Sequence, residues 1–411
     1  MKEPSSLPSK HPGSFRRWWK SLGPGIITAA LVFGPGSLTI TSKLGAVFSY
    51  NLLWVLVVTT VLMMTFTGMG ARIGLVTNQS LLATFRQRWG KWAALLAGFG
   101  IFLVTASFQA GNTIGAGLAF AESFGTSTVP WILFISLAAI SLLFTRSFYK
   151  ILEKVMVTMV GIMLISFLFT VVISKPDWVR ILQSLVPSVP EGSLLLVIAL
   201  VASTFSIGGA FYQSYLVQER GWKTSSATQA KKEAFTGILV LGLISGMILV
   251  SAATILFPQG IQVNSASDMG KALEPLYGNL ATHIFMLGLF GASFSSLVGN
   301  ATIGGTLFAD ALGLGRDLNS KPVKILISLV IVLGATVALV FGRLPLELIV
   351  FAQGVTIFVV PFIGIGMFLI AGDTKLMGAL ANSRRTRVLG VVGILVLLVL
   401  AGTNFKSLFL S

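Results

Sequence analysis

Apolar stretches of about 20 residues recur along the whole chain, separated by short segments rich in charged residues, Gly, Pro or Ser. Such stretches can cross the hydrocarbon core of a bilayer as α-helices, so the pattern predicts an all-α polytopic membrane protein. We expect eleven spans, with approximate bounds 22–47, 51–72, 92–121, 129–145, 151–173, 192–218, 233–257, 281–310, 323–342, 347–370 and 387–405. No span carries Asp or Glu near its centre.

Charge gives these spans an orientation. The chain has 29 Lys and Arg against 13 Asp and Glu, a formal net charge of +16. With a cytoplasmic N-terminus, only six of the basic residues lie outside: Lys43, Lys175, Arg180, Lys271, Arg343 and Lys406. Basic residues collect in cytoplasmic loops, so this distribution predicts a cytoplasmic N-terminus and an outer C-terminus in the cell (inner) membrane.

The bilayer accounts for the basic residues, because cytoplasmic loops face anionic lipid, and no nucleic-acid partner is expected. The N-terminal segment 1–21 is Pro/Ser-rich and then basic and aromatic. Its charges do not precede a short apolar core with a small-residue cleavage site, as they would in a cleavable signal. We therefore expect it to remain as a cytoplasmic tail.

The residue types argue against enzyme chemistry. The chain has no cysteine, which removes disulfides and thiolate metal sites, and its only two histidines are His11 and His283. No pair of acids lies in mid-membrane, and no nucleophile lies beside a base. We expect no enzyme activity, no cofactor and no resident metal.

Two of the predicted spans contain helix-breaking residues at mid-depth. The first contains Gly34, Pro35 and Gly36, and the sixth contains Gly208 and Gly209. Gly and Pro can simply kink a membrane helix. Paired interruptions at matching places in two halves, however, indicate an inverted-repeat transporter with a central binding site. We expect the chain to leave helical geometry near 34–37 and 206–209, with the two segments adjacent.

An odd number of crossings separates these two spans, so they enter the membrane from opposite sides. This predicts a first five-helix repeat at 22–173, an inverted second repeat at 192–370, and a peripheral eleventh helix at 387–405.

Several stretches carry a resemblance to a known family. GPGIITAALVFGPGS, GAVFSYNLLWVLVV, ARIGLVTNQSLLATFR, SYLVQERGW and VVPFIGIGMFLIAGDTKLMG resemble, in order and spacing, segments of the Nramp divalent-metal transporters. The resemblance covers most of the chain. It implies the inverted-repeat fold of the bacterial leucine transporter and transport of a metal cation.

The substrate-binding positions implied by this resemblance depart from the family pattern. Where typical members carry Asp-Pro-Gly-Asn, this chain has Gly34 to Ser37, and the Met-Pro-His of helix 6 aligns with Ser206 to Gly208. A carbonyl ligand aligns with Ser203, and the glutamine of helix 10 persists as Gln353. The candidate substrate-binding residues are Gly34, Ser37, Ser203, Ser206, Gly209 and Gln353.

The positions that the resemblance implies for proton transfer also carry residues that do not titrate. An Asp and a Glu of helix 3 align with Gln109 and Asn112, and two histidines of helix 6 align with Gly208 and Gln213. Amides keep the hydrogen bonding but do not titrate. Other polar residues, including Ser293 and Ser296 of helix 8, are interpreted as small residues that let helices pack closely.

These departures leave a site of hydroxyls, amides and carbonyls. A dehydrated divalent ion needs negative ligands, whereas Mg²⁺ gives up its water reluctantly, so the chain favours a hydrated Mg-like ion over Mn²⁺ or Fe²⁺. We expect a secondary-active transporter of a small solute without proton coupling. The alternatives are an uncharged or organic solute, or a receptor or scaffold that transports nothing. The sequence does not indicate an oligomeric partner.

Overall fold

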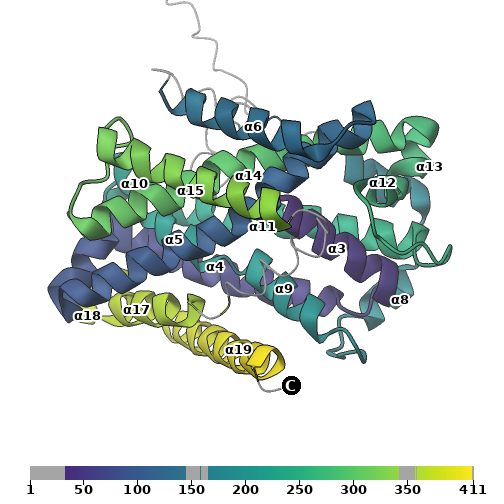
Figure 1. Cartoon of the computed structure of the whole chain (residues 1–411). Coiled ribbons are helices and arrows are strands. Elements are labelled where there is room, and N and C mark those ends of the chain that lie inside the picture. Colours follow the sequence, from purple (N-terminus) through teal and green to yellow (C-terminus); the bar gives the residue numbers. More distant parts are fainter. Residues whose placement is uncertain (1–32, 145–157, 159–164, 342–356, 358, 410–411) are drawn as a thin grey trace, which may run out of the picture.

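The protein is described by a computed structural model covering residues 33–144, 158, 165–341, 357 and 359–409 (Figure 1). These residues form helices and connecting turns, without a β-strand. The predicted tail at 1–21 and Gln353 lie outside the described residues, as do the first parts of the predicted spans 22–47, 151–173 and 347–370.

The long helices fall where the apolar pattern predicts spans. They are α3 (Pro35–Phe48), α4 (Leu53–Val76), α5 (Leu81–Phe124), α6 (Thr128–Leu143), a helix at Ile165–Ser174, α9 (Leu194–Thr204), α10 (Ile207–Glu219), α11 (Ala227–Ile255), α14 (Ala281–Leu312), α15 (Lys321–Phe341), α17 (Val360–Gly372) and α19 (Arg384–Phe409). Among the described residues, seven helices are long and apolar enough to cross a membrane, or eight if the bent pair at 360–380 is one span.

Short helices connect the long ones. They are α8 (Trp178–Gln183), α12 (Ala266–Gly270), α13 (Glu274–Tyr277) and α18 (Thr374–Met377), with 3₁₀ turns at Thr224–Ser226, Lys271–Leu273, Gly278–Leu280 and Gly378–Leu380.

Local chemistry sets the helix ends that the apolar pattern leaves undefined. The side chain of Ser80 caps α5 by accepting a hydrogen bond from the Ala83 amide at 3.0 Å. Gly90, with φ of 85°, then breaks the helical geometry between a polar first segment and the apolar part of α5. α11 begins six residues before the predicted span 233–257, because Lys231 and Lys232 can continue a helix beyond the hydrocarbon layer.

Glycines let helices of the two sequence halves lie unusually close together. A Cβ atom on Gly45 of α3 would lie 2.3 Å from the Leu249 carbonyl oxygen of α11. A Cβ on Gly70 or Gly74 of α4 would lie 2.1 or 2.4 Å from a carbonyl oxygen of α10. Without a hydrophobic driving force between membrane helices, such close backbone approach is what holds them together.

The core of the bundle is made where α5 packs against α14 and α15, and where α4 packs against α10 and α11 (Figure 1). Helix α19 lies along one edge, against α17 and α4. Only 22% of the residues in its most apolar stretch are buried. The two long pairings therefore join the halves of the sequence. The division into inverted repeats at 22–173 and 192–370 stays a prediction.

We predict that Gly74→Ala lowers the free energy of unfolding by about 1–3 kcal/mol, because its new methyl would overlap the Ser214 backbone. Gly68→Ala on the same helix is the control, since its Cβ would meet only a ring atom of Phe235 at 3.5 Å. Thermal unfolding in detergent compares the two variants. Equal melting temperatures would contradict the close packing of α4 on α10.

Candidate functional site

The structure describes the first predicted break from Phe33 onward, and there the chain becomes helical earlier than expected. Phe33 and Gly34 lie outside the helix, with Gly34 extended at φ −133° and ψ −172°, and α3 begins at Pro35. Non-helical geometry through Ser37 was therefore a wrong expectation. Proline at the first helical position needs no amide partner and is already fixed at a helical φ, so it starts this helix.

The second predicted break lies earlier than expected. Phe205 and Ser206 separate α9 from α10, whereas Gly208 and Gly209 are helical, so the prediction was wrong for these two glycines. Ser206 caps α10, its hydroxyl accepting a hydrogen bond from the Gly209 amide at 3.4 Å. The break is held from one side by Phe205, which is fully buried and packs edge-to-face on Phe66 of α4.

The first break lies against two other helices. The Ser296 hydroxyl of α14 donates a hydrogen bond to the Phe33 carbonyl oxygen at 2.9 Å. A Cβ atom on Gly34 would lie 2.7 Å from the Ser296 hydroxyl oxygen and 3.1 Å from the Asn112 side-chain oxygen of α5. Any side chain at position 34 would therefore have to displace these polar groups.

A chain of amides connects α14 to this point. The Gln109 side-chain amide donates to the Leu297 carbonyl oxygen at 2.6 Å, and the Asn112 amide donates to the Gln109 side-chain oxygen at 2.7 Å. Both side chains are buried, with exposed fractions of 0% and 3%. The Asn112 side-chain oxygen lies next to Gly34, so the first break is beside a neutral hydrogen-bond acceptor.

Ser293 adds a hydroxyl on the same side of α14. A Cβ on Gly115 of α5 would lie 2.5 Å from the Ser293 hydroxyl oxygen and 2.6 Å from the Pro35 Cβ, so Ser293 and Pro35 both border Gly115. The Ser293 hydroxyl is buried and has no hydrogen-bond partner among the described residues. An unpaired buried hydroxyl next to a helix break is a group that a ligand can satisfy.

Ser293 and Ser296 add a second feature to the interpretation of α14 as a packing helix. Their small size allows close packing, and they also place hydroxyls beside the first break, Ser296 next to Gly34 and Ser293 next to Gly115. The sequence held one usable signal, which was the concentration of hydroxyls among small residues in a buried span.

The other candidate residues lie on helices around the breaks. Ser37 is buried in the first turn of α3, and the Ser203 hydroxyl donates to the Leu200 carbonyl oxygen of its own helix at 3.0 Å. Gln213 is fully buried where α10 packs against Gly70 of α4. α3 packs against α9, the helix that ends at the second break. Direct adjacency of the two breaks stays a prediction, as does the role of each candidate residue.

The described part of the site consists of neutral polar groups. The described part of the chain contains no group of three or more His, Cys, Asp or Glu side chains placed to hold a metal. Around the first break the groups that could bind an ion or solute are hydroxyls, amides and backbone carbonyls. Such a set can hydrogen-bond a solute or a hydrated ion, but it offers no negative charge to replace lost hydration.

Comparison with known proteins places the chain in a family. The family model described as Natural resistance-associated macrophage protein-like matches residues 25–406. The chain belongs to the Nramp family. Nramp proteins are membrane transporters rather than enzymes, which confirms the expectations of an integral membrane protein without enzyme activity.

Relatives and solved structures agree with this assignment. The chain is 25% identical to a divalent metal cation transporter MntH of Caldanaerobacter subterraneus over 397 residues, which cover 92% of this chain and 90% of the relative. A crystal structure of the Eremococcus coleocola manganese transporter superimposes with a TM-score of 0.78 at 19% identity, covering 97% of this chain and 89% of that one. MhsT, crystallised in complex with L-phenylalanine, gives a TM-score of 0.60 at 16% identity, with 92% and 98% covered. The expected all-helical, leucine-transporter-like fold is confirmed.

We predict that Gln109→Leu lowers the free energy of unfolding by roughly 1–3 kcal/mol, because it leaves the buried Asn112 amide without its acceptor. It also removes the hydrogen bond from the Gln109 amide to the Leu297 carbonyl oxygen of α14. Ser123→Ala, which removes an exposed hydroxyl bonded only within α5, is the control. If the two variants melt at the same temperature in detergent, the amide chain does not hold α5 to α14.

Proposed function

We propose that the protein carries a divalent metal cation across the membrane and that the ion keeps much of its hydration water during passage. Family membership and the divalent-metal transporters among its relatives support a cation. The retention of hydration water is supported by the uncharged polar groups at the first break. There Gly34 lies beside Ser296 and Asn112 and presents no carboxylate.

Hydration chemistry then orders the candidate ions. Mn²⁺ and Fe²⁺ are held in protein sites by ligands that replace their water, often with a charged or soft atom. Ser206 stands where the resemblance implies a thioether, and Gly34 where it implies a carboxylate. Mg²⁺ keeps several waters when bound, and hydroxyl and amide oxygens can hydrogen-bond those waters. A hydrated Mg-like ion is therefore the preferred substrate.

We propose that transport is not coupled to protons. Gln109 and Asn112 are bonded to each other and to α14 as amides, and Gln213 takes the place of a histidine. None of these side chains gains or loses a proton between about pH 5 and 8. A proton carried with the substrate would need a titratable group in the membrane interior.

An uncharged or organic solute is the second candidate substrate. The unpaired Ser293 hydroxyl and the Asn112 oxygen near the first break are groups that could bind a neutral polar molecule. A receptor or scaffold without transport is the third reading. Solute flux separates a transporter from a scaffold, and ion specificity separates the two substrates.

The test is uptake into proteoliposomes that enclose a divalent-ion indicator and a pH indicator. We predict uptake of Mg²⁺ down its gradient, weak or absent uptake of Mn²⁺, and no accompanying change of internal pH. Substrate-dependent acidification would contradict the absence of proton coupling. Uptake of Mn²⁺ in preference to Mg²⁺ would contradict the hydrated-ion proposal, and the absence of any divalent-ion flux would favour the second or third reading.

A matched pair of variants tests whether the first break lies on the pathway. Gly34→Ala places a methyl group 2.7 Å from the Ser296 hydroxyl oxygen, whereas Gly246→Ala of α11 meets only a Leu56 methyl at 3.7 Å. We predict at least a tenfold loss of uptake for Gly34→Ala and near-normal uptake for Gly246→Ala. Equal uptake by two well-folded variants would remove the first break from the pathway.

The orientation in the cell membrane is also a proposal, with the N-terminus cytoplasmic and the C-terminus outside. The chain has no cysteine, so a single introduced cysteine reports its own position. A membrane-impermeant thiol reagent applied to intact cells should label Ser407→Cys and leave Ser5→Cys unlabelled. The reverse pattern would overturn the positive-inside argument.

A further inference from the structure

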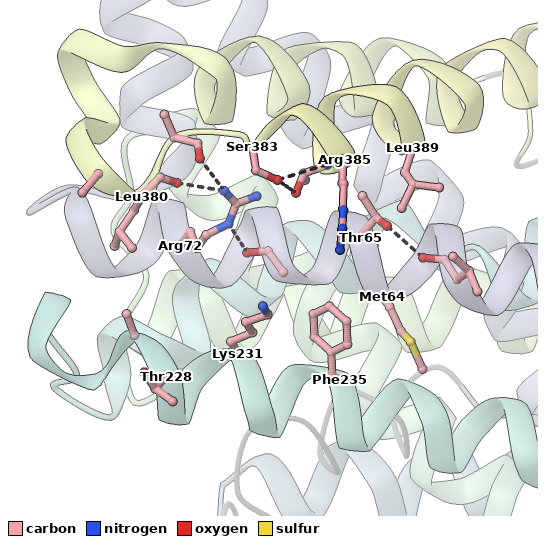
Figure 2. A pocket seen from close by; sticks show the side chains of 16 residues that line it. Met64, Thr65, Arg72, Thr228, Lys231, Phe235, Leu380, Ser383, Arg385 and Leu389 are labelled. Carbon is pink, nitrogen blue, oxygen red and sulfur yellow. Dashed lines mark hydrogen bonds between the residues drawn. The ribbon is translucent and has the colours of Figure 1, made fainter.

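A pocket separate from the helix breaks lies between α4, the start of α11, and the turn that leads into α19 (Figure 2). Its volume is about 440 Å³. Figure 2 shows Arg72, Lys231 and Arg385 on three different helices around this space. No Asp or Glu is among the described residues that line it.

Among the described residues, the three cations in the pocket have no anionic partner. None of the described residues forms a salt bridge with Arg72, Lys231 or Arg385. The Arg72 guanidinium donates to the backbone oxygens of Gly68 and Leu380 and to the Asn382 side chain. These acceptors are neutral, so they fix the guanidinium in place without compensating its charge.

The N-terminus of α19 adds to this positive potential. α19 starts beside the pocket, and its first turn is capped by Ser383, whose hydroxyl accepts from the Thr386 amide at 3.3 Å. The positive end of a helix dipole favours an anion within the first turn. The cations and the helix end therefore concentrate positive charge in one part of the pocket.

The same three helices become apolar as they leave this charged end. Along α4 the pocket lining runs from Arg72 back to Val61, and along α11 it runs from Lys231 to Phe235. Along α19 it runs from Arg385 to Leu389. On every helix, the apolar residue lies on the membrane side of the cation.

The apolar end continues into exposed hydrophobic surface. Phe235 is followed on the same face of α11 by Leu239 and Leu243, which are 48% and 51% exposed. Val61 of α4 is preceded by Val57, which is 47% exposed. Such side chains face lipid tails in a membrane protein, so the pocket opens toward the acyl region of the bilayer.

We propose that this pocket binds an anionic phospholipid of the leaflet that the basic loops face. The lipid phosphate lies among Arg72, Lys231 and Arg385, and an acyl chain follows the apolar groove past Val61 and Phe235. Charge complementarity selects an anionic headgroup, and the change from cationic to apolar lining selects a lipid over a small anion. The site is independent of the substrate at the helix breaks.

The test is native mass spectrometry of the full chain in detergent with phosphatidylglycerol or phosphatidylcholine of the same acyl chains. The pocket variant is Lys231→Ala with Arg385→Ala, and Arg72 is kept because it holds the turn before α19. The control is Lys232→Ala with Arg384→Ala, which removes the same charge from neighbouring positions outside the pocket.

We expect phosphatidylglycerol to bind the unmodified chain and the control with equal affinity, and the pocket variant about 30-fold more weakly, which corresponds to about 2 kcal/mol for two cations. Equal losses in both double variants would overturn the proposal, because they would indicate general charge attraction. Equal binding of phosphatidylcholine would overturn it as well.

Inorganic phosphate distinguishes a lipid from a free anion. In lipid-free detergent, we expect phosphatidylglycerol to raise the melting temperature of the unmodified chain and inorganic phosphate to leave it unchanged. An equal shift with inorganic phosphate would overturn the lipid assignment. If the double variant does not fold, Lys231→Ala and Arg385→Ala replace it, each with an expected loss of about fivefold; no loss in either would overturn the proposal.

Discussion

A helix interrupted inside a membrane must satisfy its freed backbone groups within the protein or with a bound molecule, because hydrocarbon offers them no partner. At the first break, the Ser296 hydroxyl donates a hydrogen bond to the Phe33 carbonyl oxygen. At the second, Ser206 caps the new helix through the Gly209 amide. These local solutions fix where the chain can leave the helix. They also bring polar atoms into the interior, where the function proposed for the protein resides.

The surrounding helices are arranged to keep this interior tightly packed and uncharged. Gly70 and Gly74 bring α4 onto α10, and the amide pair of Gln109 and Asn112 joins α5 to α14. In a medium of low dielectric, an unpaired charge at the same place would require compensation that the described residues do not supply. We propose that the protein keeps the Nramp fold and replaces the chemistry that the family resemblance implies with neutral hydrogen bonding.

Much of the fold follows from the sequence, because one physical requirement, about 20 apolar residues per crossing, dominates every span. The exact breaks do not follow from it. Pro35 starts a helix and Gly208 and Gly209 continue one, since the outcome depends on which neighbour satisfies each amide. The residues aligned with family ligands were inferred from order and spacing, and their roles stay predictions. The part played by α14 could not be inferred in this way, because Ser296 meets the chain 263 positions away, a contact that no local pattern encodes.

The central claim is that a neutral donor set has replaced a metal-coordinating one in an intact fold. Calorimetric titration with Mn²⁺ tests it most directly, on the unmodified protein and on a variant that combines Gly34→Asp, Ser37→Asn and Ser206→Met with Ser296→Ala, the last of which removes the hydroxyl nearest position 34. The account predicts weak or no Mn²⁺ binding by the unmodified protein and tighter, measurable binding by the variant. Tight Mn²⁺ binding by the unmodified protein would contradict it.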